Sequence, residues 1–272
     1  MIDNNGNTTL SGTVTNFYDF ENRMTQHGTN PGLLLAYDGD GNRVSETVGG
    51  TATKFLVDDK NPTGLPQVLD EIVSGAVTRT HAYGLQRISE NQQINGTWTP
   101  SFYGYDGHGN VRFLTNSGGT ITDSYDYDAF GMPIRTSGTT PNQFLYSGER
   151  YDSSVGLYDL RARYFNQATG RFWARDPIES SEFCCGLSWN PYIYVKQNPV
   201  NAIDPTGRNM FETGIYYEVP FTVTPGASAL SACIITALRT ANYFWWHLGN
   251  LGPPYFSPVF CAWGGAPWAP SS

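Results

Sequence analysis

Short runs of alternating apolar and polar residues, separated by turn-forming residues, dominate the first half of the chain. The segments 54–57 and 110–114 mix β-branched, aromatic and polar residues in rough alternation, which is typical of half-buried strands. Glycine is frequent, with 30 copies in 272 residues, and aromatic residues make up 14% of the chain. This composition favours short strands and turns over long helices. We therefore predict a mainly β protein.

A Tyr-Asp pair followed by a glycine or asparagine turn recurs along this half. Copies begin at Tyr18, Tyr37, Tyr105 and Tyr127, with 19 residues between the first two and 22 between the last two. Each copy predicts one β-hairpin, because the Asp side chain can bond to the turn backbone and Gly or Asn supplies the positive φ. A single hairpin cannot bury its apolar face, so we expect the units to stack into an extended sheet.

The segment 3–8 has the turn portion of such a unit without its tyrosine. We therefore expect Met1 to fall inside a repeat and the chain to be the end of a longer protein. The repeats resemble the YD repeats of RHS proteins, Tc-toxin C subunits and teneurins. That resemblance implies a coiled β-sheet shell.

From residue 144 to 207 the sequence closely resembles the RHS repeat-associated core domain. The resemblance rests on these motifs: Phe144-Leu-Tyr-Ser-Gly-Glu-Arg-Tyr-Asp152, Gly156-Leu-Tyr-Asp-Leu-Arg-Ala-Arg-Tyr-Phe165, Thr169-Gly-Arg-Phe172, Arg175-Asp-Pro-Ile178, Asn190-Pro-Tyr-Ile-Tyr194, Asn198-Pro199 and Asp204-Pro-Thr-Gly207. We predict one amphipathic strand over 156–165, a hairpin turn at 168–170 and a compact, turn-rich plug. The expected division is a YD-repeat shell (1–143), a core (144–207) and a variable tail (208–272).

Two Asp-Pro steps, at Asp176 and Asp204, supply paired carboxylates for a catalytic site. The core of the resembling family is described as an intramolecular aspartyl protease that cuts just beyond the terminal Asp-Pro-x-Gly, and Asp176 and Asp204 match its two positions. Two close carboxyls cannot both ionise, so one holds a proton while the other activates water. Arg163 matches the family's arginine, where a guanidinium could orient a carboxylate. Asp before Pro is also a common turn starter, which is the non-catalytic interpretation.

The family usually carries Leu directly after Asp-Pro-x-Gly, and here that position is Arg208. A charged residue there could misplace the bond to be cut. The register predicts cleavage between Arg208 and Asn209. Both a self-cleaving core and a core that does not cut remain open as interpretations.

The tail offers no recognisable site. Its only charged residues are Arg208, Glu212, Glu218 and Arg239. The stretch 227–249 is the most apolar, but charged and polar residues interrupt it, so we expect no membrane span. Trp245-Trp246-His247 predicts a packing cluster. The family position suggests a toxin domain, but these residues show no nucleophile and base pair.

The other candidate chemistry is excluded by composition and spacing. Four cysteines lack paired zinc spacing, and the histidines at 27, 81, 108 and 247 are scattered singly, so we predict no metal or cofactor and expect the histidines on surfaces or in turns. A net charge of −8 argues against a nucleic-acid partner. The first residues have no signal-peptide pattern.

The resemblance implies the C-terminal shell and core portion of a polymorphic-toxin-like protein, secreted or on the cell surface. Its partners would be its own C-terminal segment, upstream shell repeats, a delivery system or an immunity protein. Two alternatives stay open. One is a non-catalytic surface or carbohydrate-binding module, which a stack of exposed Tyr and Trp would favour. The other is a degenerate remnant.

Overall fold

The computed structural model describes residues 1–29, 32–176 and 190–212. All four cysteines, the stretch 227–249 and the cluster at 245–247 therefore lie outside the described residues. Residues 1–61 and 65–215 form one compact unit, which is the unit described below. Its structure is almost entirely β, as predicted. In the described part of the chain no helix is long and apolar enough to cross a membrane.

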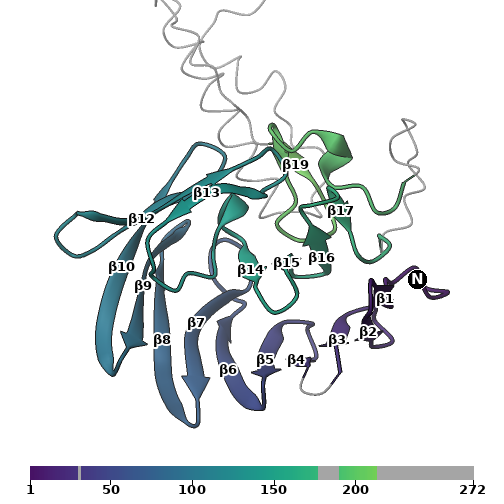
Figure 1. Cartoon of the computed structure of the whole chain (residues 1–272), viewed down its shortest axis with the longest axis horizontal. Coiled ribbons are helices and arrows are strands. Elements are labelled where there is room, and N and C mark those ends of the chain that lie inside the picture. The colour runs from purple at the N-terminus through teal and green to yellow at the C-terminus, as the bar shows by residue number, and fades with distance from the viewer. Residues whose placement is uncertain (30–31, 177–189, 213–272) are drawn as a thin grey trace, which may run out of the picture. The chain divides into compact units, whose positions relative to one another are not determined.

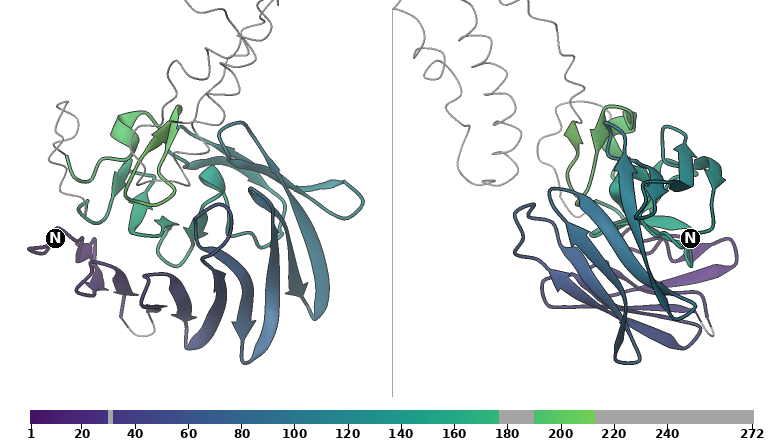
Figure 2. Two further views of the ribbon diagram at one scale, coloured as in Figure 1. Left: turned by 180° about the vertical axis from the view of Figure 1, so that it is seen from behind. Right: turned by 90° about the vertical axis from the view of Figure 1, so that its left-hand side faces the viewer.

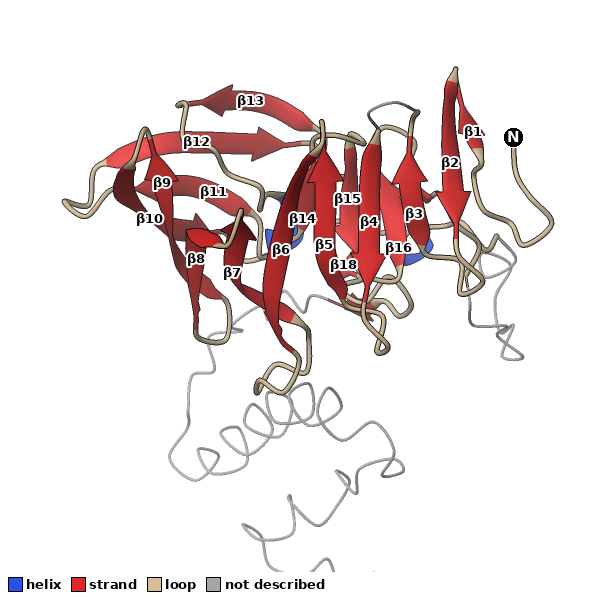
Figure 3. Cartoon of the chain, turned by 90° about the horizontal axis from the view of Figure 1, so that it is seen from below, coloured by secondary structure: helices blue, strands red, loops and turns tan. Residues whose placement is uncertain are grey.

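Thirteen antiparallel strands follow one another in chain order to form one sheet, in which each strand pairs with its neighbours in the sequence (Figures 1 and 3). The strands are β1 (Leu10–Ser11), β2 (Val14–Tyr18), β3 (Met24–His27), β4 (Leu33–Tyr37), β5 (Arg43–Val48), β6 (Thr51–Asp58), β7 (Gln67–Val73), β8 (Ala76–Tyr83), β9 (Arg87–Ile94), β10 (Thr97–Tyr105), β11 (Val111–Thr115), β12 (Ile121–Tyr127) and β13 (Pro133–Ser137). The predicted stack of hairpins is confirmed.

The Tyr-Asp units form their turns by the predicted mechanism. In the second unit, Oδ1 of Asp38 accepts hydrogen bonds from the backbone N–H of Asp40 (3.0 Å) and Asn42 (2.8 Å). The side-chain amide of Asn42 donates to Oδ2 (3.0 Å), and Gly41 supplies a φ of +86°. Equivalent turns follow Asp19, Asp106 and Asp128.

The segment near the N-terminus forms the same turn without a tyrosine. Oδ1 of Asp3 accepts from the backbone N–H of Asn5 (2.9 Å) and Asn7 (2.8 Å), and Gly6 has a φ of +88°. We call residues 3–8 the first turn. Its geometry agrees with the expectation that segment 3–8 is the turn of a repeat unit.

The tyrosines of the units link each turn to the one before it. The Tyr37 hydroxyl donates to the carbonyl of Met24 at 2.8 Å, and the other hydroxyls repeat this contact one unit along. The pairs are Tyr18 to Thr8 (3.0 Å), Tyr83 to Val68 (2.9 Å), Tyr105 to Arg87 (2.8 Å) and Tyr127 to Val111 (2.9 Å). Tyr83 was missed by the repeat pattern because Gly84 stands in place of Asp.

The concave face of the sheet is buried against the core segment (Figures 1 and 2). On β4, Leu33 and Leu35 are buried while Leu34 between them is exposed, so the predicted alternation holds. The buried side chains Val111 and Leu114 of β11 belong to one hydrophobic cluster with side chains of the core.

The core segment adds two small antiparallel sheets. One has four strands: β14 (Arg150–Asp152), β15 (Leu157–Leu160), β16 (Arg163–Asn166) and β17 (Arg171–Phe172). The other pairs β18 (Ala202–Ile203) with β19 (Phe211–Glu212), and short 3-10 turns occur at Tyr146–Gly148 and Val195–Gln197. The hairpin turn expected at 168–170 does lie between β16 and β17.

The prediction of one amphipathic strand over 156–165 was wrong. The chain reverses at Arg161, which has a φ of +63°, so that β15 and β16 pair with each other. Leu157, Tyr158 and Leu160 are all buried because the hairpin packs into two hydrophobic clusters, Leu157 in one and Tyr158 and Leu160 in the other. Alternation therefore could not have been a reliable guide here.

A buried ionic cluster joins the large sheet to the core. The guanidinium of Arg43 on β5 lies 3.0 Å from the carboxylate of Asp152 and 3.1 Å from that of Asp159. It also donates to the hydroxyl of Tyr164 (3.1 Å) and contacts Glu46. The cluster ties strand β5 to β14, β15 and β16.

His81 contradicts the expectation that every histidine lies on the surface or in a turn. It is 6% exposed on β8, and its ring lies edge-on to Phe144 at 5.3 Å between centroids. Burial, partly offset by the nearby Glu71 carboxylate, lowers the pKa of His81 to about 4. The imidazole is therefore neutral at neutral pH.

This lowered pKa predicts a loss of stability on acidification. The unfolded chain binds a proton at His81 below pH 6.5 and the folded chain only near pH 4, so the contribution of His81 to folding is lost as pH falls between these values. The loss is at most about 3 kcal/mol. We expect the urea midpoint of His81→Gln to change less between pH 7 and pH 5 than that of the parent. Equal changes in both proteins would contradict this.

Candidate functional site

Arg163 lies at the centre of the candidate site. It is the first residue of β16, its side chain is 2% exposed, and its guanidinium lies over the Phe172 ring at 3.7 Å. One terminal nitrogen is 3.1 Å from Oδ2 of Asp176, and the other is 3.5 Å from Oδ2 of Asp204. The structure therefore brings together the three residues that the resemblance implied.

Arg163 also holds the backbone of the Asp-Pro-Thr-Gly segment. Its Nε donates to the carbonyl of Gly207, and Nη1 donates to that of Pro191 (3.3 Å). Gly207 has a φ of +65°, and a Cβ there would meet the Leu160 carbonyl at 2.3 Å. Only glycine fits this approach, which explains the last residue of the motif.

Asp204 forms a turn like those of the repeats but in a different environment. Its Oδ1 accepts from the backbone N–H of Arg208 at 3.1 Å, as Oδ1 of Asp38 accepts from the residue four positions on. Asp204 is 4% exposed, and burial raises its pKa even though Arg163 opposes the shift. At Asp38, hydrogen bonds led by the Asn42 side chain outweigh burial and lower the pKa.

The predicted cleavage bond lies directly beside Asp204. The backbone nitrogen of Asn209, which belongs to the Arg208–Asn209 peptide bond, is 3.1 Å from Oδ1 of Asp204 and 3.1 Å from the Thr206 hydroxyl. Thr206 in turn donates to Oδ1 of Asp204 at 3.1 Å. Arg208 itself is exposed. Its charge is therefore not buried beside the bond, and the backbone contacts set the register.

Two charged residues of this region escaped the sequence analysis. Arg161 donates to the carbonyl of Pro205 and to Glu149 at 2.9 Å. Burial raises the pKa of Glu149, while Arg161 opposes the shift. Arg161 alone had a possible signal, because it stands two residues before Arg163 in the same motif. Glu149 becomes a neighbour only through the fold.

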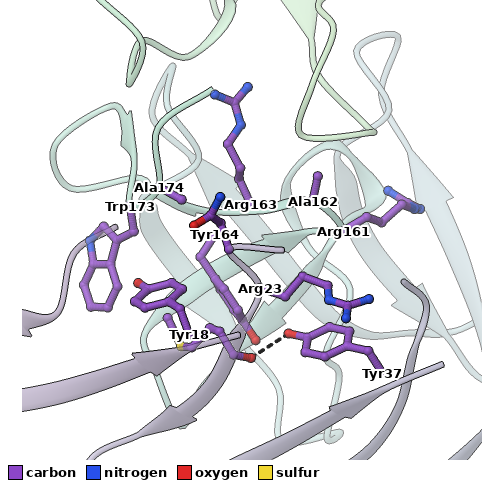
Figure 4. Close-up of a pocket in the computed structure, with 11 residues that line it drawn as sticks. Tyr18, Arg23, Tyr37, Arg161, Ala162, Arg163, Tyr164, Trp173 and Ala174 are labelled. Carbon is purple, nitrogen blue, oxygen red and sulfur yellow. Dashed lines mark hydrogen bonds between the residues drawn. The ribbon is translucent and has the colours of Figure 1, made fainter. Parts of the chain in front are cut away.

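Arg163 and Tyr164 point to opposite sides of β16. Figure 4 shows Tyr164 directed toward Tyr18 and Tyr37 in a pocket next to the large sheet, with the Arg163 guanidinium directed away from them. Trp173 and Ala174 line the same pocket. Strand β16 therefore contacts the shell with one residue and the two carboxylates with the preceding one.

The chemistry available at this site is that of carboxyl groups. Within residues 1–29, 32–176 and 190–212, no cluster of three metal-ligating side chains is present. One carboxyl group is deeply buried with a raised pKa, and Asp176 is more open, with 28% of its side chain exposed. Such a pair can serve as acid and base in hydrolysis.

Comparisons with known proteins give the relationship of the chain. No family model matches it. Over 212 residues it is 33% identical to the tRNA3(Ser)-specific nuclease WapA of Bacillus spizizenii and 32% identical to the tRNA nuclease WapA of Bacillus subtilis. Each match covers 75% of this chain and 9% of the relative, so the chain spans about a tenth of their length. Over 75 residues, 28% of this chain and 5% of the relative, it is 37% identical to the toxin protein Tse5 of Pseudomonas aeruginosa.

Solved structures share the fold. The Photorhabdus luminescens Tc holotoxin pore matches with a TM-score of 0.60 at 20% identity, over 82% of this chain and 11% of the other. The TcdB2–TccC3 complex without its hypervariable C-terminal region matches with a TM-score of 0.55 at 20% identity, over 74% and 10%. The chain is an RHS/YD-repeat protein.

This assignment makes the thirteen-stranded sheet part of an RHS-type, toxin-like shell. The boundaries 1–143, 144–207 and 208–272 stay a prediction. In the RHS shell the large sheet ends at Ser137 and the four-stranded sheet begins at Arg150. The catalytic roles of Asp176, Asp204 and Arg163 are likewise a matter of proposal.

The buried pair in the RHS core predicts a specific stability effect. Arg163→Met leaves the Asp204 carboxylate buried without its cation, and we expect a loss of about 3–5 kcal/mol in the free energy of unfolding. Adding Asp204→Asn removes the stranded charge, so the double variant should recover part of this loss. Urea denaturation measures both. A double variant no more stable than Arg163→Met would show that the charge of Asp204 does not cause the loss.

Proposed function

We propose that the chain is the C-terminal shell and core portion of an RHS toxin-like protein that cuts itself between Arg208 and Asn209. The observation that carries the proposal is the position of Asp204. Its Oδ1 lies 3.1 Å from the nitrogen of that peptide bond, and its other oxygen contacts the guanidinium that also binds Asp176. In the second repeat turn Oδ1 of Asp38 also accepts from the backbone N–H four residues on, but Asp38 is less buried than Asp204 and its pKa is lowered instead of raised.

The two carboxyl groups would take different roles in hydrolysis. Asp176 is the more open, so it takes a proton from water as the oxygen attacks the carbonyl carbon of Arg208. Burial raises the pKa of Asp204, which makes its protonated form more accessible than that of an ordinary carboxyl group; in that form it gives its proton to the Asn209 nitrogen once the tetrahedral intermediate makes that nitrogen basic. The C–N bond then breaks, leaving a new carboxyl group on Arg208 and a new amine on Asn209.

Arg163 would act by position and charge. Its Nε holds the Gly207 carbonyl, one residue before the bond that breaks, while its terminal nitrogens fix both carboxyl groups. The Arg208 side chain is exposed, so it does not determine how the backbone runs here. Hydrogen bonds from the Arg208 N–H to Asp204 and Thr206 hold the backbone instead. This arrangement supports cleavage despite the departure from leucine.

The biological role follows from the relatives named nuclease and toxin. We propose that the shell encloses the segment after Asn209 and that cleavage separates the two. Secretion or display at the cell surface, further shell repeats, a delivery system and an immunity protein complete this proposal. Carbohydrate binding has less support, because the described residues expose no tyrosine and, of the tryptophans, Trp98 alone, and the repeat tyrosines face inward toward strand carbonyls.

Intact-mass spectrometry of the full chain tests the cleavage. The parent should give two fragments that divide between Arg208 and Asn209, and Asp176→Asn and Asp204→Asn should each give one intact mass. Asp38→Asn is the matched control, because it changes the same kind of turn outside the site and should still cleave. A single intact mass for the parent, from soluble folded protein, would refute self-cleavage.

The raised pKa of Asp204 gives cleavage a pH dependence. The protonated acid is required, so the cleavage rate should fall as pH rises through the pKa of Asp204, which lies above 3.8. The rate is measured by following the cleaved fraction after synthesis in a cell-free system buffered at several pH values. A cleavage rate that increases as the pH of the buffer is raised would assign the acid role to another group.

A further inference from the structure

The first turn contacts the chain immediately before Asp176. The backbone N–H of Thr8 donates to the Trp173 carbonyl at 2.9 Å, and the N–H of Arg175 donates to the Gly6 carbonyl at 3.1 Å. The segment that ends in Asp176 therefore adds to the first turn as a strand adds to an edge.

The other side of this segment is held by the core. The N–H of Asp176 donates to the Pro191 carbonyl at 3.0 Å, and the N–H of Phe172 donates to the Tyr192 carbonyl at 2.8 Å. The Tyr192 hydroxyl reaches across to the Gly6 carbonyl at 3.1 Å. Residues near 6, 175 and 192 thus form one hydrogen-bonded layer. Asp176 belongs to this layer and carries the carboxylate that contacts Arg163.

The contact at Gly6 leaves no room for a side chain. A Cβ there would lie 2.7 Å from the Cβ of Arg175 and 2.9 Å from the Tyr192 hydroxyl. Gly41 occupies the same position of the second turn with nearly the same φ, +86° against +88°. At Gly41 the nearest atom to an added Cβ is Nη1 of Arg23, at 3.4 Å. The two glycines therefore have the same positive φ, but only Gly6 has atoms within 3 Å of the position that a Cβ would take.

We propose that the first turn positions Asp176 for the reaction. Resting on the proposed self-cleavage, this inference assigns to Gly6 and Thr8 the task of fixing the carboxylate that activates water. They act through Trp173 and Arg175 and touch neither the scissile bond nor the carboxyl groups themselves. The site is then complete only when the beginning of the sheet has packed on the core.

Paired glycine substitutions test this assignment. Gly6→Ala and Gly41→Ala introduce similar backbone strain, but only the former pushes on Arg175. We expect the rate constant of self-cleavage after cell-free synthesis to fall roughly 100-fold in Gly6→Ala, as for a reacting group displaced by about an ångström. Gly41→Ala should cleave like the parent. Equal slowing in both variants would overturn the proposal.

A rescue separates positioning from general destabilisation. Arg175→Gly removes the Cβ that the new methyl group meets most closely, while the contact with the Tyr192 hydroxyl and the strain of alanine at a positive φ remain. Gly6→Ala combined with Arg175→Gly should therefore regain part of the cleavage rate, with Arg175→Gly alone as the reference. A double variant as slow as Gly6→Ala would count against the assigned contact.

Hydrogen exchange decides the inference even when the parent does not cleave. The amide protons of Thr8 and Arg175 should be protected in the parent and in Gly41→Ala and should exchange faster in Gly6→Ala. Uncut parent with this pattern would reject the proposed function while keeping the structural role of the first turn. Equal protection in all three proteins would overturn the role of the first turn.

Discussion

A chain that reverses direction repeatedly beside a buried core must provide hydrogen-bond partners for the backbone groups of its turns. Here the Asp side chain accepts the N–H groups of its own turn, and a tyrosine of the next unit donates to a carbonyl of the unit before, as Tyr37 does to Met24. An unpaired buried carbonyl costs about 1–3 kcal/mol, so each unit depends on its successor. This dependence sets the spacing of the units and the inward direction of the tyrosines.

Buried charged groups, like the buried backbone groups of the sheet, need partners, and they find them between the sheet and the core and within the core. Arg43 contacts carboxylates from two strands of the small sheet, and Arg163 contacts carboxylates from the middle and from the end of the core sequence. Removing one partner of a buried ion pair leaves the other charge buried without compensation, which is strongly destabilising. Such clusters therefore favour one particular arrangement of the segments that carry the charges. The proposed site depends on this specificity, because the arginine that pairs with Asp204 also binds the backbone carbonyl just before Arg208.

The sequence predicted the hairpins well because each turn is local: Asp, Gly and Asn stand within five residues of one another. Tyr83 was missed, because its unit replaces Asp by Gly84. The split of 156–165 was missed since burial on both faces removes alternation. Asp176, Arg163 and Asp204 were identified through family resemblance, which carries three-dimensional information. Glu149 and the first turn had no such motif, and the contact of Tyr192 with Gly6 spans 186 residues.

The contact between Thr8 and Trp173 also orders events during synthesis. A ribosome adds about 5–20 residues per second, so the first turn waits roughly ten to thirty seconds for its partner segment to be made. Throughout that interval the nascent chain can pair neighbouring strands, but it has no complete layer around Asp176. Asp204 and the Arg208–Asn209 bond are synthesised later still, so the first turn can have its partner segment before the proposed scissile bond exists.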